Sequence, residues 1–223
     1  MDAAGTVRLP SVMAISEAVL QFALVAALLT VIPGMDTVLV LRTAISRGHG
    51  SAFATAAGIC TGTVFWGVAA ALGASALLAA SEAAFTVLKV AGACYMAWLA
   101  ISMIVRSFRP GTAVDTAVAA RQGSARTAWL SGITTSLLNP KVGVFYMAMI
   151  PQFLPPDASP LLMGILLPLV HNVEGMAWFA LIILATHHAR RWLQSDTVSK
   201  ATDRIAGVVL LAFAAKIATS KAA

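Results

Sequence analysis

The sequence predicts an all-α integral membrane protein with six transmembrane helices, arranged as two inverted three-helix repeats whose first and fourth helices are broken. The 223 residues are 59% hydrophobic and only 11% charged, with a mean hydropathy of +0.86, whereas soluble domains are about 25% charged. Several windows hold about 20 mostly apolar residues, the length that crosses a hydrocarbon core. Each half opens with an apolar run that a proline interrupts, at Pro33 and Pro140.

Six apolar runs, bounded by polar or proline-rich turns, give the expected spans in order. They lie at about residues 15–41, 52–78, 84–105, 128–150, 161–186 and 205–220. A basic turn with two glycines follows the first run, and the Ser81-Glu82 turn separates the second run from the third. The proline-rich turn 151–160 separates the fourth run from the fifth, and the basic segment 187–204 precedes the sixth.

The segments outside the spans complete the expected organisation. Residues 1–14 are expected to form an N-terminal extension, in which Met13 is an alternative start to Met1. This extension does not have the pattern of a secretory signal peptide. Residues 15–220 then form a single transmembrane bundle, and the longest polar connection, residues 107–127, is expected to be a flexible cytoplasmic loop.

Basic residues gather after the odd-numbered spans. Ten of the 15 Lys and Arg residues lie there: Arg42, Arg47, Arg106, Arg109, Arg121, Arg126, Arg190, Arg191, Lys200 and Arg204. The opposite turns contain Glu82 and Asp157 and no Lys or Arg. Because Lys and Arg collect in cytoplasmic loops, the odd-numbered connections are expected in the cytoplasm and both termini outside. The net charge of +6 does not indicate nucleic-acid binding, because no basic run carries interleaved aromatic residues.

The two broken segments contain the residues expected to form a binding site. These residues are Pro33, Gly34 and Asp36 in the first segment and Asn139, Pro140 and Lys141 in the second. A charge at the bilayer centre costs roughly 2.5–3.5 kcal/mol on insertion scales, so Asp36 and Lys141 are expected to pair. We interpret them as a switchable pair that opens when substrate or a proton binds Asp36. The alternative is an ion pair that only fixes the helices.

The chemistry of these breaks favours a zwitterionic ligand. Broken helices expose backbone N–H and C=O groups around a cavity, and a helix N-terminus favours a carboxylate. An acid such as Asp36 or Glu174 favours an ammonium group. An amino acid carries both groups and needs both kinds of partner.

A second polar pair, His171 and Glu174, lies in the fifth span. The two residues are three positions apart and share a helix face. We expect them to bind substrate or ions along a polar pore. Metal binding and local packing stay open as alternatives, although a metal site needs further ligands.

Enzyme and cofactor signatures are missing from the sequence. It contains no nucleophile elbow with its triad, no Walker motif and no dinucleotide fingerprint. We therefore predict no enzyme activity and no cofactor or metal, and any pumping must use an ion gradient or a partner subunit. Cys60 and Cys94 fall inside spans and show no disulfide or metal spacing. Ala54, Gly58 and Gly62 form a small-residue stripe that fits either an internal helix contact or a homodimer.

Several short motifs resemble those of a known family. They are Pro33-Gly34-Met35-Asp36, residues 42–48, Gly58 with Gly62, Leu88-Lys89-Val90-Ala91-Gly92-Ala93-Cys94-Tyr95, Leu138-Asn139-Pro140-Lys141 and Pro151-Gln152-Phe153. At these residues the chain, from Glu17 to its C-terminus, resembles the LysE/RhtB amino-acid exporters. The resemblance implies a six-span bacterial inner-membrane protein that exports amino acids or their derivatives by proton antiport. Met35 departs from the family pattern, which usually has a second proline there, and this softens the break.

The expected function is therefore secondary active export of amino acids or small derivatives across the bacterial inner membrane. The expected partners are the amino acid, protons and the lipid bilayer, with no nucleic acid and with a homodimer left open. Three alternatives remain: a metal-cation exporter of the same superfamily, an intramembrane enzyme using His171 and Glu174, and a helical scaffold in which Asp36 and Lys141 serve only assembly.

Overall fold

The computed structural model describes residues 12–108, 123–186 and 195–219, which are helical and contain no strand. The helices are α1 (Val12–Val31), α2 (Met35–Ala80), α3 (Glu82–Arg106), α4 (Ala125–Leu138), α5 (Pro140–Met149), the short 3₁₀ helix η1 (Ile150–Phe153), α6 (Pro160–Leu184) and α8 (Asp196–Thr219). Two of them, over Met35–Leu77 and Pro160–Leu184, are long and apolar enough to cross a membrane. The count of six spans stays a prediction.

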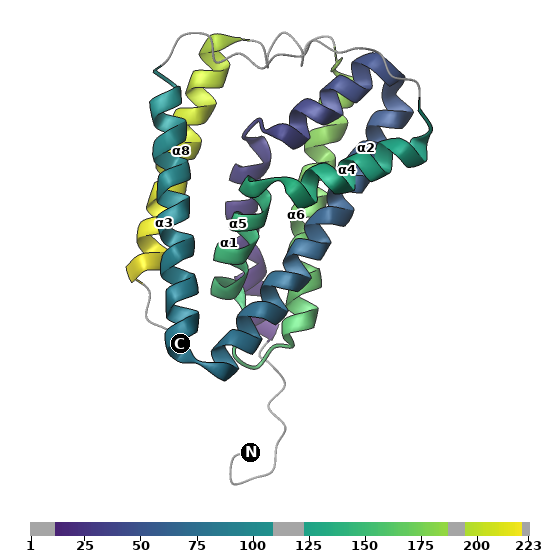
Figure 1. Cartoon of the computed structure of the whole chain (residues 1–223). Coiled ribbons are helices and arrows are strands. Elements are labelled where there is room, and N and C mark those ends of the chain that lie inside the picture. Colours follow the sequence, from purple (N-terminus) through teal and green to yellow (C-terminus); the bar gives the residue numbers. More distant parts are fainter. Residues whose placement is uncertain (1–11, 109–122, 187–194, 220–223) are drawn as a thin grey trace.

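Helix α2 bends sharply at Gly48, the point where a basic turn was expected. Gly48 has a φ of +81°, a backbone conformation that a residue without a Cβ adopts at little cost. The bend divides α2 into a first arm (residues 35–47) and a second arm (residues 49–80), which run in different directions (Figure 1). In Figure 1 the first arm runs obliquely from the end of α1 to the bend, and the second arm returns along the bundle.

The chain leaves helical geometry at both of the expected breaks. Helix α1 ends at Val31, and Gly34 is the N-cap of α2. Helix α4 ends at Leu138, and Asn139 alone separates it from α5. Pro140 occupies the first turn of α5, where its missing N–H costs no hydrogen bond and where it disfavours helical geometry at Asn139.

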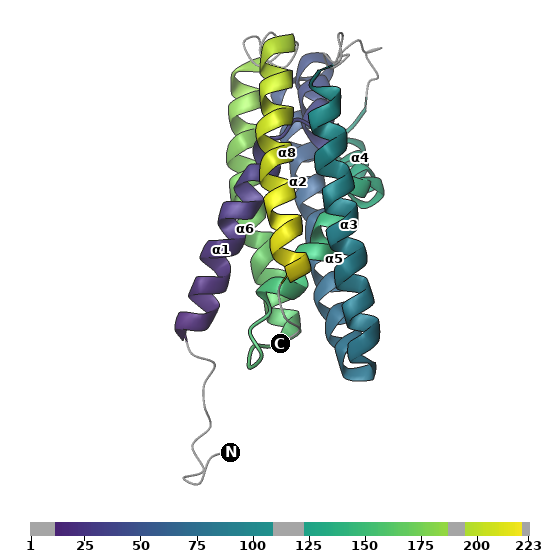
Figure 2. The ribbon, with the colours of Figure 1, turned by 90° about the vertical axis from the view of Figure 1, so that its left-hand side faces the viewer.

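The helices pack as one bundle with α3 and α8 paired at its side (Figures 1 and 2). The second arm of α2 contacts α4 and α6, and α1 packs on α6. The start of α1 and the end of α8 lie toward one end of the bundle, and the bend of α2 lies at the other (Figure 1). The aromatic side chains Phe22, Phe145 and Phe153 are buried together between α1, α5 and η1.

The small-residue stripe of α2 packs inside the chain, against α4. A Cβ on Gly58 would overlap the carbonyl group of Trp129, and a Cβ on Gly132 would overlap the carbonyl oxygen of Thr55. A Cβ on Gly62 would lie 2.7 Å from the Cβ of Ser136. These glycines let the two helix backbones approach closely, so the internal contact is the alternative that the structure supports.

We expect the substitution Gly58→Ala to destabilise the folded protein by about 1–3 kcal/mol, because the added methyl group forces α2 and α4 apart. The matched control is Gly73→Ala on the same helix, where the added Cβ meets nothing within 4 Å. This control should gain about 0.5–1 kcal/mol from its higher helix propensity. Thermal unfolding of the purified variants in detergent measures both effects, and equal midpoints would contradict the close helix crossing.

Candidate functional site

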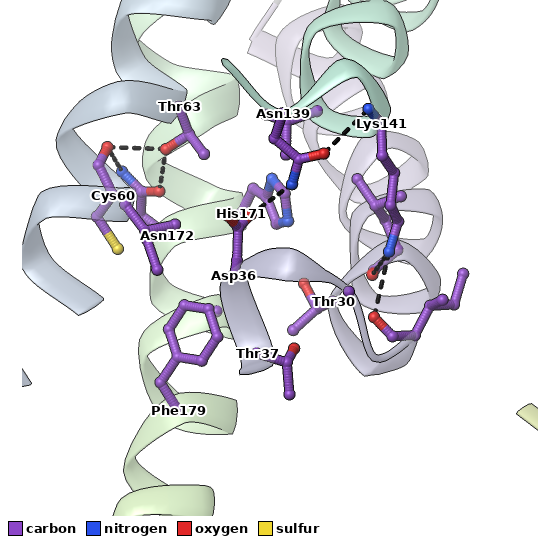
Figure 3. A pocket seen from close by; sticks show the side chains of 16 residues that line it. Thr30, Asp36, Thr37, Cys60, Thr63, Asn139, Lys141, His171, Asn172 and Phe179 are labelled. Atoms are coloured by element: carbon purple, nitrogen blue, oxygen red, sulfur yellow. Dashed lines mark hydrogen bonds between the residues drawn. The ribbon is translucent and has the colours of Figure 1, made fainter. Parts of the chain in front are cut away.

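The two helix breaks lie beside one pocket between the helices (Figure 3). The pocket has a volume of about 50 Å³ and is lined by α1, both arms of α2, α5 and α6. Its polar lining residues are Thr30, Asp36, Thr37, Cys60, Thr63, Asn139, Lys141, His171 and Asn172. Breaking the helices thus brings charged and polar side chains into an otherwise apolar interior.

Lys141, from the second break, reaches the end of the helix at the first break. Its Nζ donates to the carbonyl oxygens of Leu29 at 3.3 Å and Ile32 at 3.1 Å. These carbonyls lie at the end of α1, where backbone acceptors have no partner within the helix and where a cation is favoured. Figure 3 shows the Lys141 side chain descending toward these two oxygens.

Asn139 connects the second break to the acid of the first. Its side-chain oxygen accepts from the backbone N–H of Lys141 at 3.1 Å and so caps α5. Its side-chain nitrogen donates to Oδ2 of Asp36 at 3.2 Å. Asp36 lies in the first turn of α2, where a negative charge is favoured. Side chains of the second break therefore bind the first break: Lys141 binds the end of α1, and Asn139 binds Asp36.

Two acceptor atoms at the pocket lack a hydrogen-bond partner. They are Oδ1 of Asp36 and Oγ1 of Thr30, and both atoms are buried. A buried polar atom without a partner carries a desolvation cost of about 1–3 kcal/mol. Both residues line the pocket, so a ligand with N–H donors could satisfy these atoms.

Helix α6 contributes two hydrogen-bonded groups to the pocket. Nδ1 of His171 lies 2.7 Å from the hydroxyl of Tyr146, and the tyrosine is fully buried. Asn172 donates to the carbonyl oxygen of Cys60 at 2.9 Å, and its side-chain oxygen lies 2.5 Å from the hydroxyl of Thr63. The first group joins α5 to α6, and the second joins α6 to the second arm of α2.

The structure brings together some of the predicted site residues and separates others. Gly34, Asp36, Asn139, Lys141 and His171 line the pocket. Pro33 and Pro140 flank the breaks, and Glu174 is a half-buried residue of α6; none of the three lines the pocket. Within the described ranges, no three His, Cys, Asp or Glu residues gather as metal ligands.

Sequence reasoning missed several polar residues of the pocket. They are Thr30, Thr37, Thr63 and Asn172. Thr30 could have been found because it lies directly before the first break, and Asn172 because it interrupts an apolar run beside His171. Nothing in the local sequence marks Thr63, whose partner Asn172 is 109 positions away.

Broken helices around a charged pocket, in a chain this apolar, define a class of protein: a helical membrane protein that moves small solutes. The chain belongs to the LysE type translocator family, whose model matches residues 27–221. The resemblance seen in the sequence is thereby confirmed. The protein is a membrane transport protein and not an enzyme, which removes the intramembrane enzyme from the alternatives.

Three relatives align with nearly the whole chain. The uncharacterized membrane protein YrhP of Bacillus subtilis is 27% identical over 210 residues, 92% of this chain and 100% of the relative. The homoserine/homoserine lactone efflux protein of Salmonella typhimurium is 28% identical, over 90% of this chain and 95% of the relative. The leucine efflux protein of Klebsiella pneumoniae is 28% identical, over 87% and 91%. No solved structure matches the chain.

Proposed function

We propose that this protein is a secondary active exporter of amino acids or small amino-acid derivatives, working across the bacterial inner membrane in exchange for protons. One observation carries the proposal: the carboxylate of Asp36 and the ammonium of Lys141 line the same pocket between two broken helices. An amino acid carries the two complementary charges. Relatives named for homoserine and leucine efflux support the same substrate class.

In this proposal the two charges bind opposite ends of the substrate. The substrate ammonium donates to the partnerless oxygens of Asp36 and Thr30. The substrate carboxylate meets the ammonium of Lys141 and competes with the α1 carbonyls for its protons. Binding therefore loosens the contact that joins α5 to the end of α1, and the two halves of the bundle become able to move relative to each other.

Proton coupling is assigned to Asp36 in this scheme. A proton on the Asp36 carboxylate removes its attraction for the substrate ammonium. The proton and the substrate then occupy the same site in turn, which is the simplest basis for antiport. His171 and Glu174 remain candidates for further polar contacts, and only His171 lines the pocket.

The six-span arrangement is part of the same proposal. Span one is α1 with the first arm of α2, and span two is the second arm. Spans three, five and six are α3, α6 and α8, and span four is α4 with α5. Helix α1 begins and helix α8 ends toward the same end of the bundle (Figure 1), which supports an even number of spans and two inverted three-helix halves. The excess of Lys and Arg in the odd-numbered connections supports placing both termini outside. The connection predicted at residues 107–127 would then be cytoplasmic, in a multi-pass bundle predicted at residues 15–220 and preceded by the extension 1–14. Residues 1–11 and 109–122 lie outside the described residues, and helices α1 and α4 begin earlier than predicted, at Val12 and Ala125.

A reconstitution experiment tests the proposal. Liposomes containing the purified protein are loaded with a mixture of amino acids, and a proton gradient is imposed. Selective efflux that requires the gradient is the expected result. Protein-free liposomes with the same gradient serve as the control for leakage. If folded protein moves no amino acid, the exporter proposal is wrong, and divalent cations are the next solutes to measure.

A further inference from the structure

A second hollow lies next to the pocket, on the surface of α2. It is a groove of about 440 Å³ with an almost entirely apolar surface. Its lining residues are Cys60, Thr61, Val64, Phe65 and Val68 on α2 and Asn172 on α6. The α2 residues lie at positions that share one face of a helix. The mechanism proposed above makes no use of this groove.

The groove and the charged pocket meet at two residues. Cys60 and Asn172 line both hollows. The amide of Asn172 is held there by the carbonyl of Cys60 and the hydroxyl of Thr63. The amide nitrogen and the amide oxygen of Asn172 each have a hydrogen-bond partner. The residue between the two hollows therefore does not require a hydrogen bond from a ligand. A ligand that extends across this boundary would place its charged groups in the pocket and its apolar part in the groove.

The pocket by itself is too small for a whole amino acid. Its volume is about 50 Å³, whereas a cavity of about 150 Å³ is what holds a benzene molecule. The charged groups of a substrate have their partners in the pocket, at Asp36 and Lys141, and its side chain needs further space. The adjoining groove is the space that shares a wall with the pocket.

We propose that this groove is the side-chain subsite, and that the substrate is an amino acid with an apolar side chain of about the size of leucine. This inference rests on the exporter function proposed above. The two named relatives, for homoserine and for leucine efflux, are equally similar to this chain and do not decide between a polar and an apolar side chain. The apolar lining decides for leucine, because the hydroxyl of homoserine would lose its water there without gaining a partner.

Filling the groove provides the first test. The substitution Val64→Trp places a large side chain in the groove, and Leu72→Trp adds the same side chain at an exposed position of α2 outside it. Val64→Trp should lower leucine efflux from liposomes at least about tenfold and change homoserine efflux less than about threefold. Leu72→Trp should change neither. If Val64→Trp lowers both substrates alike, or neither, the groove is not a side-chain subsite.

Labelling of Cys60 provides a second test that keeps Val64 intact. In a Cys94→Ala background, Cys60 is the remaining thiol, and its reaction with methyl methanethiosulfonate can be followed by mass spectrometry. Leucine should slow this reaction several-fold, and homoserine should slow it much less. If leucine gives no protection, or if Cys60 does not react at all, the subsite assignment is overturned and the groove belongs to a lipid chain. If folded wild-type protein moves no amino acid in the liposome assay, the exporter function is wrong. If it moves amino acids but the two tests above fail, only the subsite assignment is wrong.

Discussion

Replacing Lys141 by glutamine should lower amino-acid efflux at least about tenfold, since a hydrogen bond to a charged group contributes about 1.5–3 kcal/mol. The substitution removes the cation that we assign to the substrate carboxylate. It also removes the charge that holds the carbonyls of Leu29 and Ile32 at the end of α1. Initial efflux rates from liposomes, at equal amounts of folded protein, measure the loss.

Two further lysine variants show whether the loss of efflux in Lys141→Gln comes from the lost charge or from a damaged fold. Lys141→Arg keeps a cation at this position and should retain part of the efflux. Lys200→Gln on α8 removes a half-buried lysine far from the pocket in sequence and should leave efflux unchanged. Thermal unfolding shows whether each variant is folded. Full efflux by folded Lys141→Gln protein would remove Lys141 from the binding site.

The helix breaks could be predicted from the sequence because their cause is local. Pro33 and Pro140 each remove a backbone donor and restrict the residue before them, whatever surrounds the chain. The bend at Gly48 was also marked, since its glycine lies between basic residues that follow an apolar run. The close approach at Gly58 was predicted as one of two alternatives, because the spacing of small residues shows that a helix can pack there but not which one.

The partners of the charged groups could not be predicted in the same way. The pairing of Asp36 with Lys141 stays a prediction. The sequence did not indicate that Asn139 donates to Asp36 or that Lys141 donates to carbonyl oxygens at the end of α1. Unsatisfied carbonyls at a broken helix end compete for an ammonium group, and a sequence does not show how closely they approach.

Glu174 shows the limit of a pattern on a single helix. It shares a face with His171 by spacing, yet His171 lines the pocket and Glu174 does not. Residues three apart on a helix differ by about 60° in direction, which is enough to separate a pocket from the neighbouring packing surface. Whether His171 or Glu174 faces the pocket depends on how α6 crosses α2. That crossing is set by contacts between distant parts of the chain.

The substitution Asp36→Asn should impair both proton coupling and substrate binding, because the proposal assigns both to one carboxylate. Asparagine has nearly the same shape and keeps an oxygen that can accept from Asn139, but it cannot exchange a proton near neutral pH. Gradient-driven efflux should therefore fall at least about tenfold, a difference of about 1.4 kcal/mol or more in the driven step. Exchange of labelled for unlabelled amino acid across the same liposomes needs no net proton movement but should fall as well, because the amide, like a protonated carboxyl group, carries no charge for the substrate ammonium.

The matched control is Asp157→Asn, which changes an exposed acid in the turn before α6 and should affect neither reaction. The comparison of the two assays makes the result specific. If exchange continues while driven efflux is lost, the substrate binds without the charge of Asp36, and the proton and the substrate do not compete for this carboxylate. If driven efflux continues at the normal rate, protons are coupled elsewhere, and His171 becomes the next residue to replace because it also lines the pocket. Loss of driven efflux together with exchange is the result that a proton and a substrate competing for one carboxylate require.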